Sequence, residues 1–280
     1  MYRYTPSLAA AILCVVAFGI LAIVHLALYV KGSNRVVGLV FVGAVCETAG
    51  YTARTFSHYN NTAWGPFIVQ GVLTLVGPLW FAAGIYVVFG RVMVVAGGGK
   101  SVGFVGPRWC TRVFVGADVL TLIVQGLGSS IMGTMQLSLA IAGSKIVIAG
   151  LALQVATFLV FLTAALDFQW RMLRKQTTSA STVEKGPPVW RKTLYVLYGV
   201  STLILLRCVF RLVEYSMGNA AYAMAHEWTL YCFDALPMVA VLVVLAVLRP
   251  ERCLEGDVVM VEEKGDGDSD GEIRVVEGVV

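Results

Sequence analysis

The stretch "STLILLRCVFRLVEY" (residues 201–215) is an apolar run that nevertheless contains two arginines and a glutamate. Arg207, Arg211 and Glu214 are spaced i, i+4 and i+7, and a helix places residues at this spacing on one face. Hydrocarbon solvates charge poorly, so a charged face of a membrane-spanning helix is expected to turn toward the inside of a helix bundle. The stretch therefore predicts a membrane helix with one polar, inward face.

The rest of the chain has the composition of a protein that crosses the membrane several times. Of its 280 residues 58% are hydrophobic and only 14% charged, with a mean hydropathy of +0.79, whereas a soluble domain has roughly 25% charged residues. A helix needs about 20 mainly apolar residues to cross the hydrocarbon. The predicted fold class is all-α, a bundle of seven membrane-spanning helices within residues 1–250. The predicted spans lie near 8–30, 36–56, 67–90, 112–136, 144–167, 193–216 and 226–248.

Positive charges in the loops predict the direction of the chain. Sixteen of the 21 Lys and Arg residues lie in the loops after the first, third and fifth spans or in the C-terminal tail. Because cytoplasmic loops are enriched in these residues, the N-terminus is predicted outside and the C-terminus in the cytoplasm. The acidic, glycine-rich tail of residues 251–280 is predicted to be disordered. The basic residues form no face interleaved with aromatic residues, so no nucleic-acid partner is expected.

Polar residues also line single faces of other spans. Glu47 and Arg54 share a face of the second span, and Glu227, Tyr231 and Asp234 are spaced i, i+4 and i+7 in the seventh. We interpret these faces as the lining of a polar pocket in the outer half of the bundle, with a thinner polar path reaching inward. The alternative is a structural network of ion pairs that joins the helices. The candidate substrate-binding residues are Glu47, Arg54, Gln70, Asp118, Gln125, Gln154, Arg207, Arg211, Glu214, Glu227, Tyr231 and Asp234.

The charge balance of the pocket and two prolines in the spans lead to two hypotheses, one about the ligand and one about movement. If all of its groups are ionised, its carboxylates outnumber its arginines by two, which suits an amphiphile with a cationic or zwitterionic head. Pro78 and Pro237 interrupt spans and are candidate hinges, although a static kink is an equally good explanation. The expected ion pairs are Arg211 with Glu214, Arg207 with Asp234, and Arg54 with Glu47 or Glu227.

The polar residues occur in longer motifs. These are "ETAGYTAR" (47–54), "FVGADVLTLIVQGLGS" (114–129), "LLRCVFRLVEY" (205–215) and "GNAAYAMAHEWTLYCFDALPM" (218–238). With them the chain resembles, from about Tyr4 to Pro250, the RTA1-like family of fungal membrane proteins, the lipid-translocating exporters. The resemblance implies seven helices, an outside N-terminus and no nucleotide-binding domain. One departure is Arg249-Pro250, where family members often have His-Pro.

The resemblance also implies a range of functions. Characterised members are associated with export of sphingoid long-chain bases, with resistance to toxic amphiphiles and sterol analogues, and in one case with porphyrin and haem traffic. We therefore predict a plasma-membrane protein that translocates a lipid-like amphiphile. It is expected to do so without its own ATPase, because the sequence lacks a GxxxxGK phosphate-binding motif. The expected partners are a lipid or amphiphilic small molecule and the bilayer.

Other functions stay open as alternatives. A seven-helix receptor or sensor for a lipid fits the same topology, and a porphyrin or haem transporter would favour His226, which stands beside Glu227. An intramembrane metallohydrolase would need several ligating histidines, but the sequence has only His25, His58 and His226, on three different segments. No enzymatic activity, metal or cofactor is therefore expected.

Overall fold

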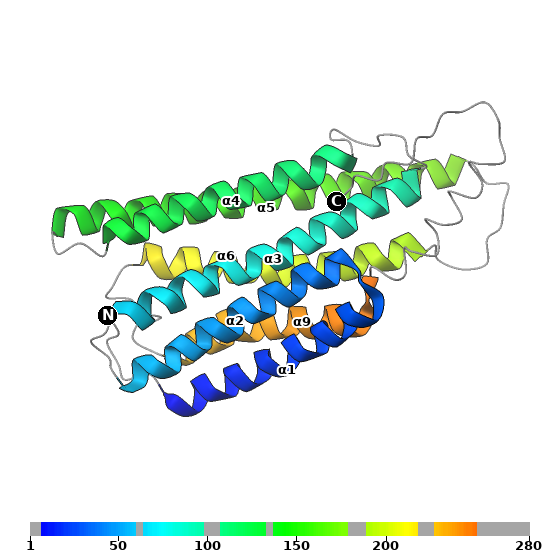
Figure 1. Ribbon diagram of the computed structural model, residues 1–280. Coiled ribbons are helices and arrows are strands. Elements are labelled where there is room, and N and C mark those ends of the chain that lie inside the picture. The colour runs from blue at the N-terminus through cyan, green and yellow to red at the C-terminus, as the bar shows by residue number, and fades with distance from the viewer. Residues whose placement is uncertain are drawn as a thin grey trace.

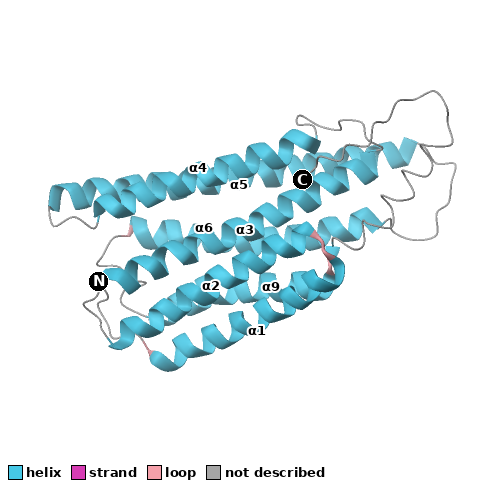
Figure 2. Cartoon of the chain, in the orientation of Figure 1, coloured by secondary structure: helices cyan, strands magenta, loops and turns pink. Residues whose placement is uncertain are grey.

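The computed structural model describes residues 7–59, 64–97, 107–132, 137–178, 189–217 and 227–250, and within these ranges it is built from helices without strands (Figures 1 and 2). Seven helical segments are long and apolar enough to cross a membrane, which confirms the predicted fold class. The direction of the chain across the membrane stays a prediction, and the tail of residues 251–280 lies outside the described residues. The helices are α1 (Leu8–Gly32), α2 (Arg35–Tyr59), α3 (Trp64–Gly97), α4 (Pro107–Met132), α5 (Leu137–Thr178), α6 (Val189–Ser216), α8 (Glu227–Leu230), the π-helix η1 (Tyr231–Ala235) and α9 (Leu236–Leu248).

The predicted third and fifth spans were too short. The apolar helices run over Ile68–Ala96 and Ser138–Arg174 rather than 67–90 and 144–167. The predicted spans stop where apolar composition ends, but backbone hydrogen bonding continues into residues that favour helix, such as Met172 and Arg174. At 1.5 Å per residue α5 is about 63 Å long, roughly twice the thickness of the hydrocarbon. Residues 133–136 and 226, at the edges of two other predicted spans, lie outside the described residues.

The helices form a ring that is closed across its middle. α2 packs between α1 and α3, α4 lies between α3 and α5, and α6 contacts both α5 and α9, which returns to α1 (Figure 1). α3 and α6 also contact each other directly. This cross-contact brings α2, α3, α6 and the last span together, and the polar residues meet there.

Apolar side chains fill the rest of the bundle and cover its outside. In the other half of α3 the Phe89 ring packs edge-on against Phe161 and Phe168 of α5, with ring centroids 5.4 and 5.8 Å apart. On the outer surface Leu13 and Val247 are each 71% exposed. An apolar surface of this kind is suited to lipid rather than to water.

Small residues allow α2 and α3 to approach closely. A Cβ atom added at Gly43 would lie 2.4 Å from the Phe81 ring and 2.9 Å from the carbonyl oxygen of Gly77. One added at Gly50 would lie 3.0 Å from Thr74. Gly43 and Gly50 are therefore close-packing contacts between the two helices. The contact holds the polar face of α2 against α3.

We expect Gly43→Ala to destabilise the protein by about 1–3 kcal/mol, because the added methyl group overpacks the interface between α2 and α3. The measurement is the apparent melting temperature of the purified protein in detergent. Gly116→Ala on α4 is the matched control, since a Cβ atom there meets nothing within 4 Å. An equal melting temperature for the two variants would contradict this account of the interface.

Candidate functional site

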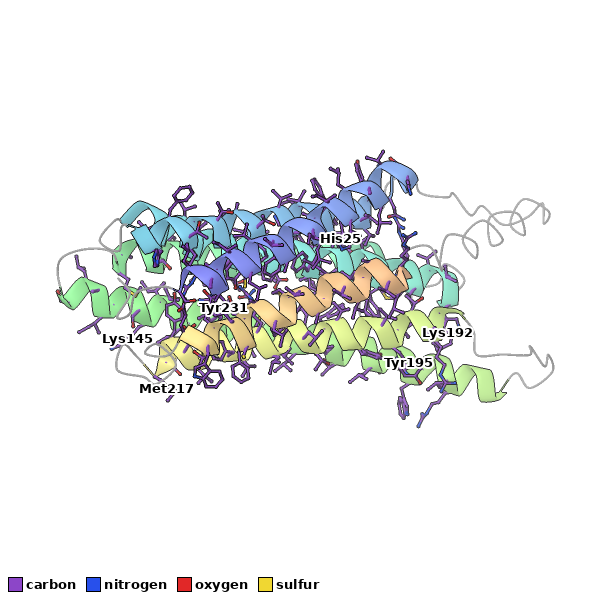
Figure 3. The ribbon with its side chains drawn as sticks, turned by 90° about the horizontal axis from the view of Figure 1, so that it is seen from below. His25, Lys145, Lys192, Tyr195, Met217 and Tyr231 are labelled. Atoms are coloured by element: carbon purple, nitrogen blue, oxygen red, sulfur yellow. The ribbon has the colours of Figure 1, made fainter. Side chains whose placement is uncertain are left out.

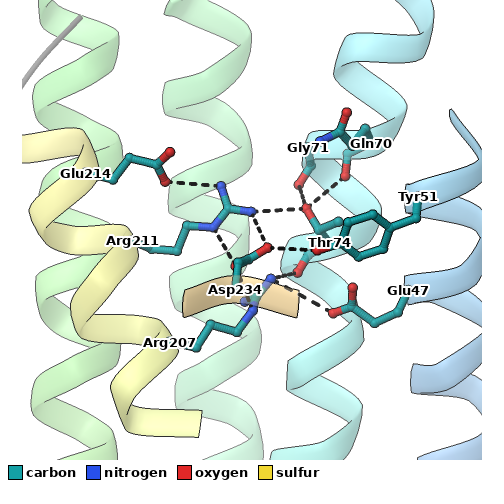
Figure 4. Close-up of polar contacts among 9 residues, drawn as sticks. All are labelled: Glu47, Tyr51, Gln70, Gly71, Thr74, Arg207, Arg211, Glu214 and Asp234. Carbon is teal, nitrogen blue, oxygen red and sulfur yellow. Dashed lines mark hydrogen bonds and ion pairs between the residues drawn. The ribbon is translucent and has the colours of Figure 1, made fainter. Parts of the chain in front are cut away.

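Polar side chains from four helical segments meet in one buried group, which we call the central network (Figure 4). Each member is at most 9% exposed, although the whole group lies between membrane-spanning helices. It lies toward the end of the bundle where α1 begins and α6 ends, which the loop charges predict to be outside. Its members are Glu47 of α2, Thr74 of α3, Arg207, Arg211 and Glu214 of α6, and Asp234 of η1.

Asp234 is the centre of this network. The guanidinium of Arg211 binds both of its carboxylate oxygens, Nε to Oδ1 at 2.9 Å and Nη2 to Oδ2 at 3.0 Å. Arg207 places its Nε 2.9 Å from the same Oδ1. The Tyr51 hydroxyl donates to Oδ2 at 3.5 Å. One carboxylate that is 1% exposed therefore pairs with two arginines of α6, and Arg211 binds it in the bidentate geometry that makes such pairs strong.

Pro78 explains how α3 takes part. In an unbroken helix the N–H of residue 78 would donate to the carbonyl of Thr74, but proline has no N–H. The freed Thr74 carbonyl accepts a hydrogen bond from Nη2 of Arg207 instead. The Thr74 hydroxyl also accepts from Nη2 of Arg211 at 3.4 Å and donates to the backbone carbonyl of Gln70 at 2.9 Å. A backbone acceptor that proline exposes is thus satisfied by a buried guanidinium, and α3 continues through Pro78 as a helix.

Pro237 has a related effect on the last span. The sequence predicted a span over 226–248 that Pro237 interrupts, and the structure has a helical segment over Glu227–Leu248 with a π-helical turn, Tyr231–Ala235, shortly before Pro237. There the N–H of Leu236 bonds to the carbonyl of Tyr231, five residues earlier. Pro237 cannot donate to the carbonyl four residues before it, and the wider turn accommodates this loss. π-Helical turns are rare in proteins, and those that occur are often found at functional sites. This one carries both Tyr231 and Asp234.

The other two carboxylates of the central network are less well paired. Glu214 lies 3.5 Å from Nη1 of Arg211, and Glu47 lies 3.9 Å from Nη2 of Arg207. Neither the Glu214 Oε2 nor the Glu47 Oε1 atom has a hydrogen-bond partner among the described residues. The network therefore contains three carboxylates and two guanidiniums, and Asp234 engages both guanidiniums.

A second polar group, the outer cluster, joins the start of α1 to α2 and the last span. The Glu227 carboxylate accepts hydrogen bonds from Nη2 of Arg54 at 2.8 Å and from the Tyr231 hydroxyl at 2.9 Å. It also accepts the backbone N–H of Ser7, at 3.0 and 2.8 Å from its two oxygens. Arg54 donates in turn to the Tyr231 hydroxyl at 3.1 Å. Figure 3 places Tyr231 toward the end of the bundle that carries Lys145 and Met217, away from Lys192 and Tyr195.

The remaining predicted residues do not join these groups. Asp118 of α4 accepts a hydrogen bond from the Tyr86 hydroxyl of α3 at 2.8 Å, and its Oδ1 atom has no partner among the described residues. Gln125 donates to Gln154 at 2.9 Å between α4 and α5. The single polar path expected from the sequence is therefore divided into the central network, the outer cluster and these two helix-to-helix pairs.

The structure confirms the predicted ion pairs. The expected pairs of Arg211 with Glu214, Arg207 with Asp234, and Arg54 with Glu227 are all present. The side chains of the central network are almost fully buried against one another and their neighbours, and we call this arrangement the closed conformation. The role of these residues as the lining of a substrate pocket stays a prediction.

Sequence reasoning missed Tyr51, Thr74 and Tyr86, whose side chains bond to Asp234, Arg211 and Asp118 respectively. Two of them had a usable signal. Tyr51 lies four residues after Glu47 and so shares its helix face, and Thr74 lies four residues before Pro78. Tyr86 lies in an apolar run, and only the packing of α3 on α4 shows its contact with Asp118.

The described residues contain no histidine in the central network or the outer cluster. His25 is buried on α1, with Nε2 3.2 Å from the carbonyl oxygen of Leu242 on α9. His226 lies outside the described residues. Within the described ranges, His, Cys, Asp and Glu side chains form no group of three or more that could hold a metal ion.

We expect Asp234→Asn to destabilise the protein strongly, because it leaves Arg207 and Arg211 buried without the carboxylate they share. Breaking a buried ion pair in this way costs about 3–5 kcal/mol. The matched control is Asp167→Asn on α5, whose carboxylate is 32% exposed and pairs with Arg171 at 2.8 Å. An exposed pair contributes at most about 1 kcal/mol. Thermal unfolding of the purified variants in detergent measures the difference, and similar losses for both would contradict the central position of Asp234.

Comparison with known proteins identifies the family. The family profile described as "RTA1 like protein" matches residues 40–257. Protein RTA1 of Saccharomyces cerevisiae is 32% identical over 89% of this chain and 84% of its own length. Two other proteins of that yeast are similar. Protoporphyrin uptake protein 1 is 30% identical, over 88% of this chain and 91% of its own length. The sphingoid long-chain base transporter RSB1 is 26% identical, over 90% of this chain and 73% of its own length. No solved structure matches. The extent of the family match and of these likenesses shows that the chain belongs to the RTA1-like family of multi-pass membrane proteins.

Proposed function

We propose that this protein translocates an amphiphile with a cationic or zwitterionic head, such as a sphingoid long-chain base, across the plasma membrane. The head enters the central network while the hydrocarbon tail stays in lipid. The observation that carries the proposal is the excess of carboxylates over guanidiniums at membrane depth, buried between four helical segments. Such a path moves a head group without a chemical step, so no catalytic residue is proposed.

Charge complementarity supports the choice of head group. A charge inside the bilayer is costly unless it is paired. An incoming ammonium group would provide a partner for the carboxylate that the two arginines leave poorly paired. A neutral cluster would offer no such gain, and an anionic head would have to displace Asp234 from Arg207 and Arg211.

The closed conformation suggests how the head gains access. The outer cluster ties the start of α1 to α2 and the last span, and the π-helical turn carries one residue of that cluster and one of the central network. Separation of Glu227 from Arg54 and Ser7 would therefore release the same segment that holds Asp234. In this proposal Pro237 and the π-turn permit the movement, which is the hinge role predicted from the sequence.

The similar proteins point to two substrate classes. One is named a sphingoid long-chain base transporter, which agrees with the acidic excess. Another is named a protoporphyrin uptake protein, and protoporphyrin carries two carboxylates. We favour the cationic amphiphile because both arginines of the central network are already bound to Asp234.

The test uses purified protein in liposomes and a fluorescent sphingoid base whose head is a quaternary ammonium, so that it crosses slowly without protein. We expect the wild type to move the probe between leaflets and Glu47→Gln to do so at least about tenfold more slowly, a difference of about 1.4 kcal/mol, because the neutral amide cannot form an ion pair with the charged head. Asp167→Asn should match the wild type, because Asp167 lies on α5, which contributes no residue to the central network.

Three results would change the proposal. Movement of protoporphyrin but not of the ammonium probe would favour the second substrate class. Equal rates for the wild type and Glu47→Gln would place the path elsewhere. Binding of the probe by folded protein without any movement would favour the sensor that the sequence left open.

A further inference from the structure

One carboxylate of the central network, Glu47, is deeply buried and has only a distant cationic partner. Glu47 is 1% exposed, and its Oε1 atom accepts no hydrogen bond from the described residues. The nearest cationic atom that pairs with it is Nη2 of Arg207, at 3.9 Å. That nitrogen already donates to the carbonyl of Thr74, and the Nε of Arg207 faces Asp234. Glu47 therefore competes for a guanidinium that two other groups already occupy.

The packing of α3 holds Glu47 in this position. A Cβ atom added at Gly77 would lie 2.8 Å from Oε1 of Glu47 and 3.0 Å from its carboxyl carbon. The carboxyl group thus rests against bare backbone, where no side chain of residue 77 can donate to it. Any substitution at Gly77 would displace the carboxyl group.

The charged and titratable groups around Glu47 come from four elements. α1 contributes a thiol, α2 a thiol and a phenol, α6 two guanidiniums, and η1 a carboxylate. In the order of those elements they are Cys14, Cys46, Tyr51, Arg207, Arg211 and Asp234.

The network as a whole has one carboxylate too many for its guanidiniums. Asp234 is matched by two arginines, and Glu214 lies 3.5 Å from Arg211 at a position that is 8% exposed. Glu47 is both more deeply buried and farther from its partner. An isolated ionised carboxylate in such surroundings costs several kcal/mol, and it is relieved by a proton or by a cation.

We propose that Glu47 carries a proton in the closed conformation and exchanges it for the cationic head of the substrate. The O–H bond of the Glu47 carboxyl group breaks, the proton passes to water, and the carboxylate pairs with the head group. No oxidation or other bond change is involved. Proton and amphiphile thus occupy the same carboxylate in turn, so the protein couples amphiphile movement in one direction to proton movement in the other. This inference rests on the proposed function and names its energy source.

The first test measures proton release on binding. Wild-type protein in weakly buffered detergent solution receives N,N,N-trimethylsphingosine, whose quaternary head cannot itself bind or lose a proton, and a pH indicator dye reports release. We expect about one proton per molecule bound, as linkage requires for exchange at one site. Glu47→Gln should release none. Asp167→Asn on α5, whose carboxylate belongs to neither polar group, is the control and should release as much as the wild type.

The outcomes separate this inference from the proposed function. Binding without proton release by the wild type overturns the exchange and leaves translocation intact. Release that persists in Glu47→Gln assigns the proton to another group and also overturns the proposal. If the wild type binds no probe, the proposed function itself is wrong.

A second measurement needs no variant and so does not depend on the folding of Glu47→Gln. Wild-type protein in liposomes is given a pH gradient of either direction, with the membrane potential clamped by potassium and valinomycin. The quaternary probe should accumulate on the more acidic side and reverse its net direction when the gradient is reversed. Accumulation that is independent of the gradient would overturn the coupling.

Discussion

The inability of hydrocarbon to solvate charge determines the organisation of this bundle. Every ionised group between the helices must find a partner inside the protein, because lipid supplies none. Asp234 meets this requirement for both arginines of α6, and Glu227 meets it for Arg54. These contacts join α6 to the last span and α2 to the last span. The ion pairs thus link the helices that lie together in the middle of the ring.

The two prolines within spans change the backbone hydrogen bonding next to the central network. Pro78 leaves the Thr74 carbonyl free for Arg207, and Pro237 follows a π-turn that carries Asp234. Each proline weakens its own helix, and each weakened turn faces the central network. At both turns a backbone hydrogen bond of the regular α-helix is missing, so less backbone bonding holds the network there. In the proposed function, the turns before these prolines are where the amphiphile would enter the network.

Helical spacing was sufficient to predict the seven spans and the residues that share a face, such as Arg207, Arg211 and Glu214. The expected pair of Arg207 with Asp234 between two helices is also present. For Arg54 the sequence left Glu47 and Glu227 open, and only the arrangement of α2 and the last span decides for Glu227. The π-turn was not predictable from periodicity, because it changes the register over a single turn. Asp118 was grouped with the pocket on polarity alone, although Tyr86 binds it elsewhere in the bundle.

The most direct measurement is a cryo-electron-microscopy structure of the protein in nanodiscs with a bound trimethylated sphingoid base. We expect density for the quaternary head beside the Glu47 carboxylate, with Asp234 still bound to Arg207 and Arg211 and the tail leaving between helices into lipid. Density for the ligand only on the lipid-facing surface, away from Glu47, would contradict this account.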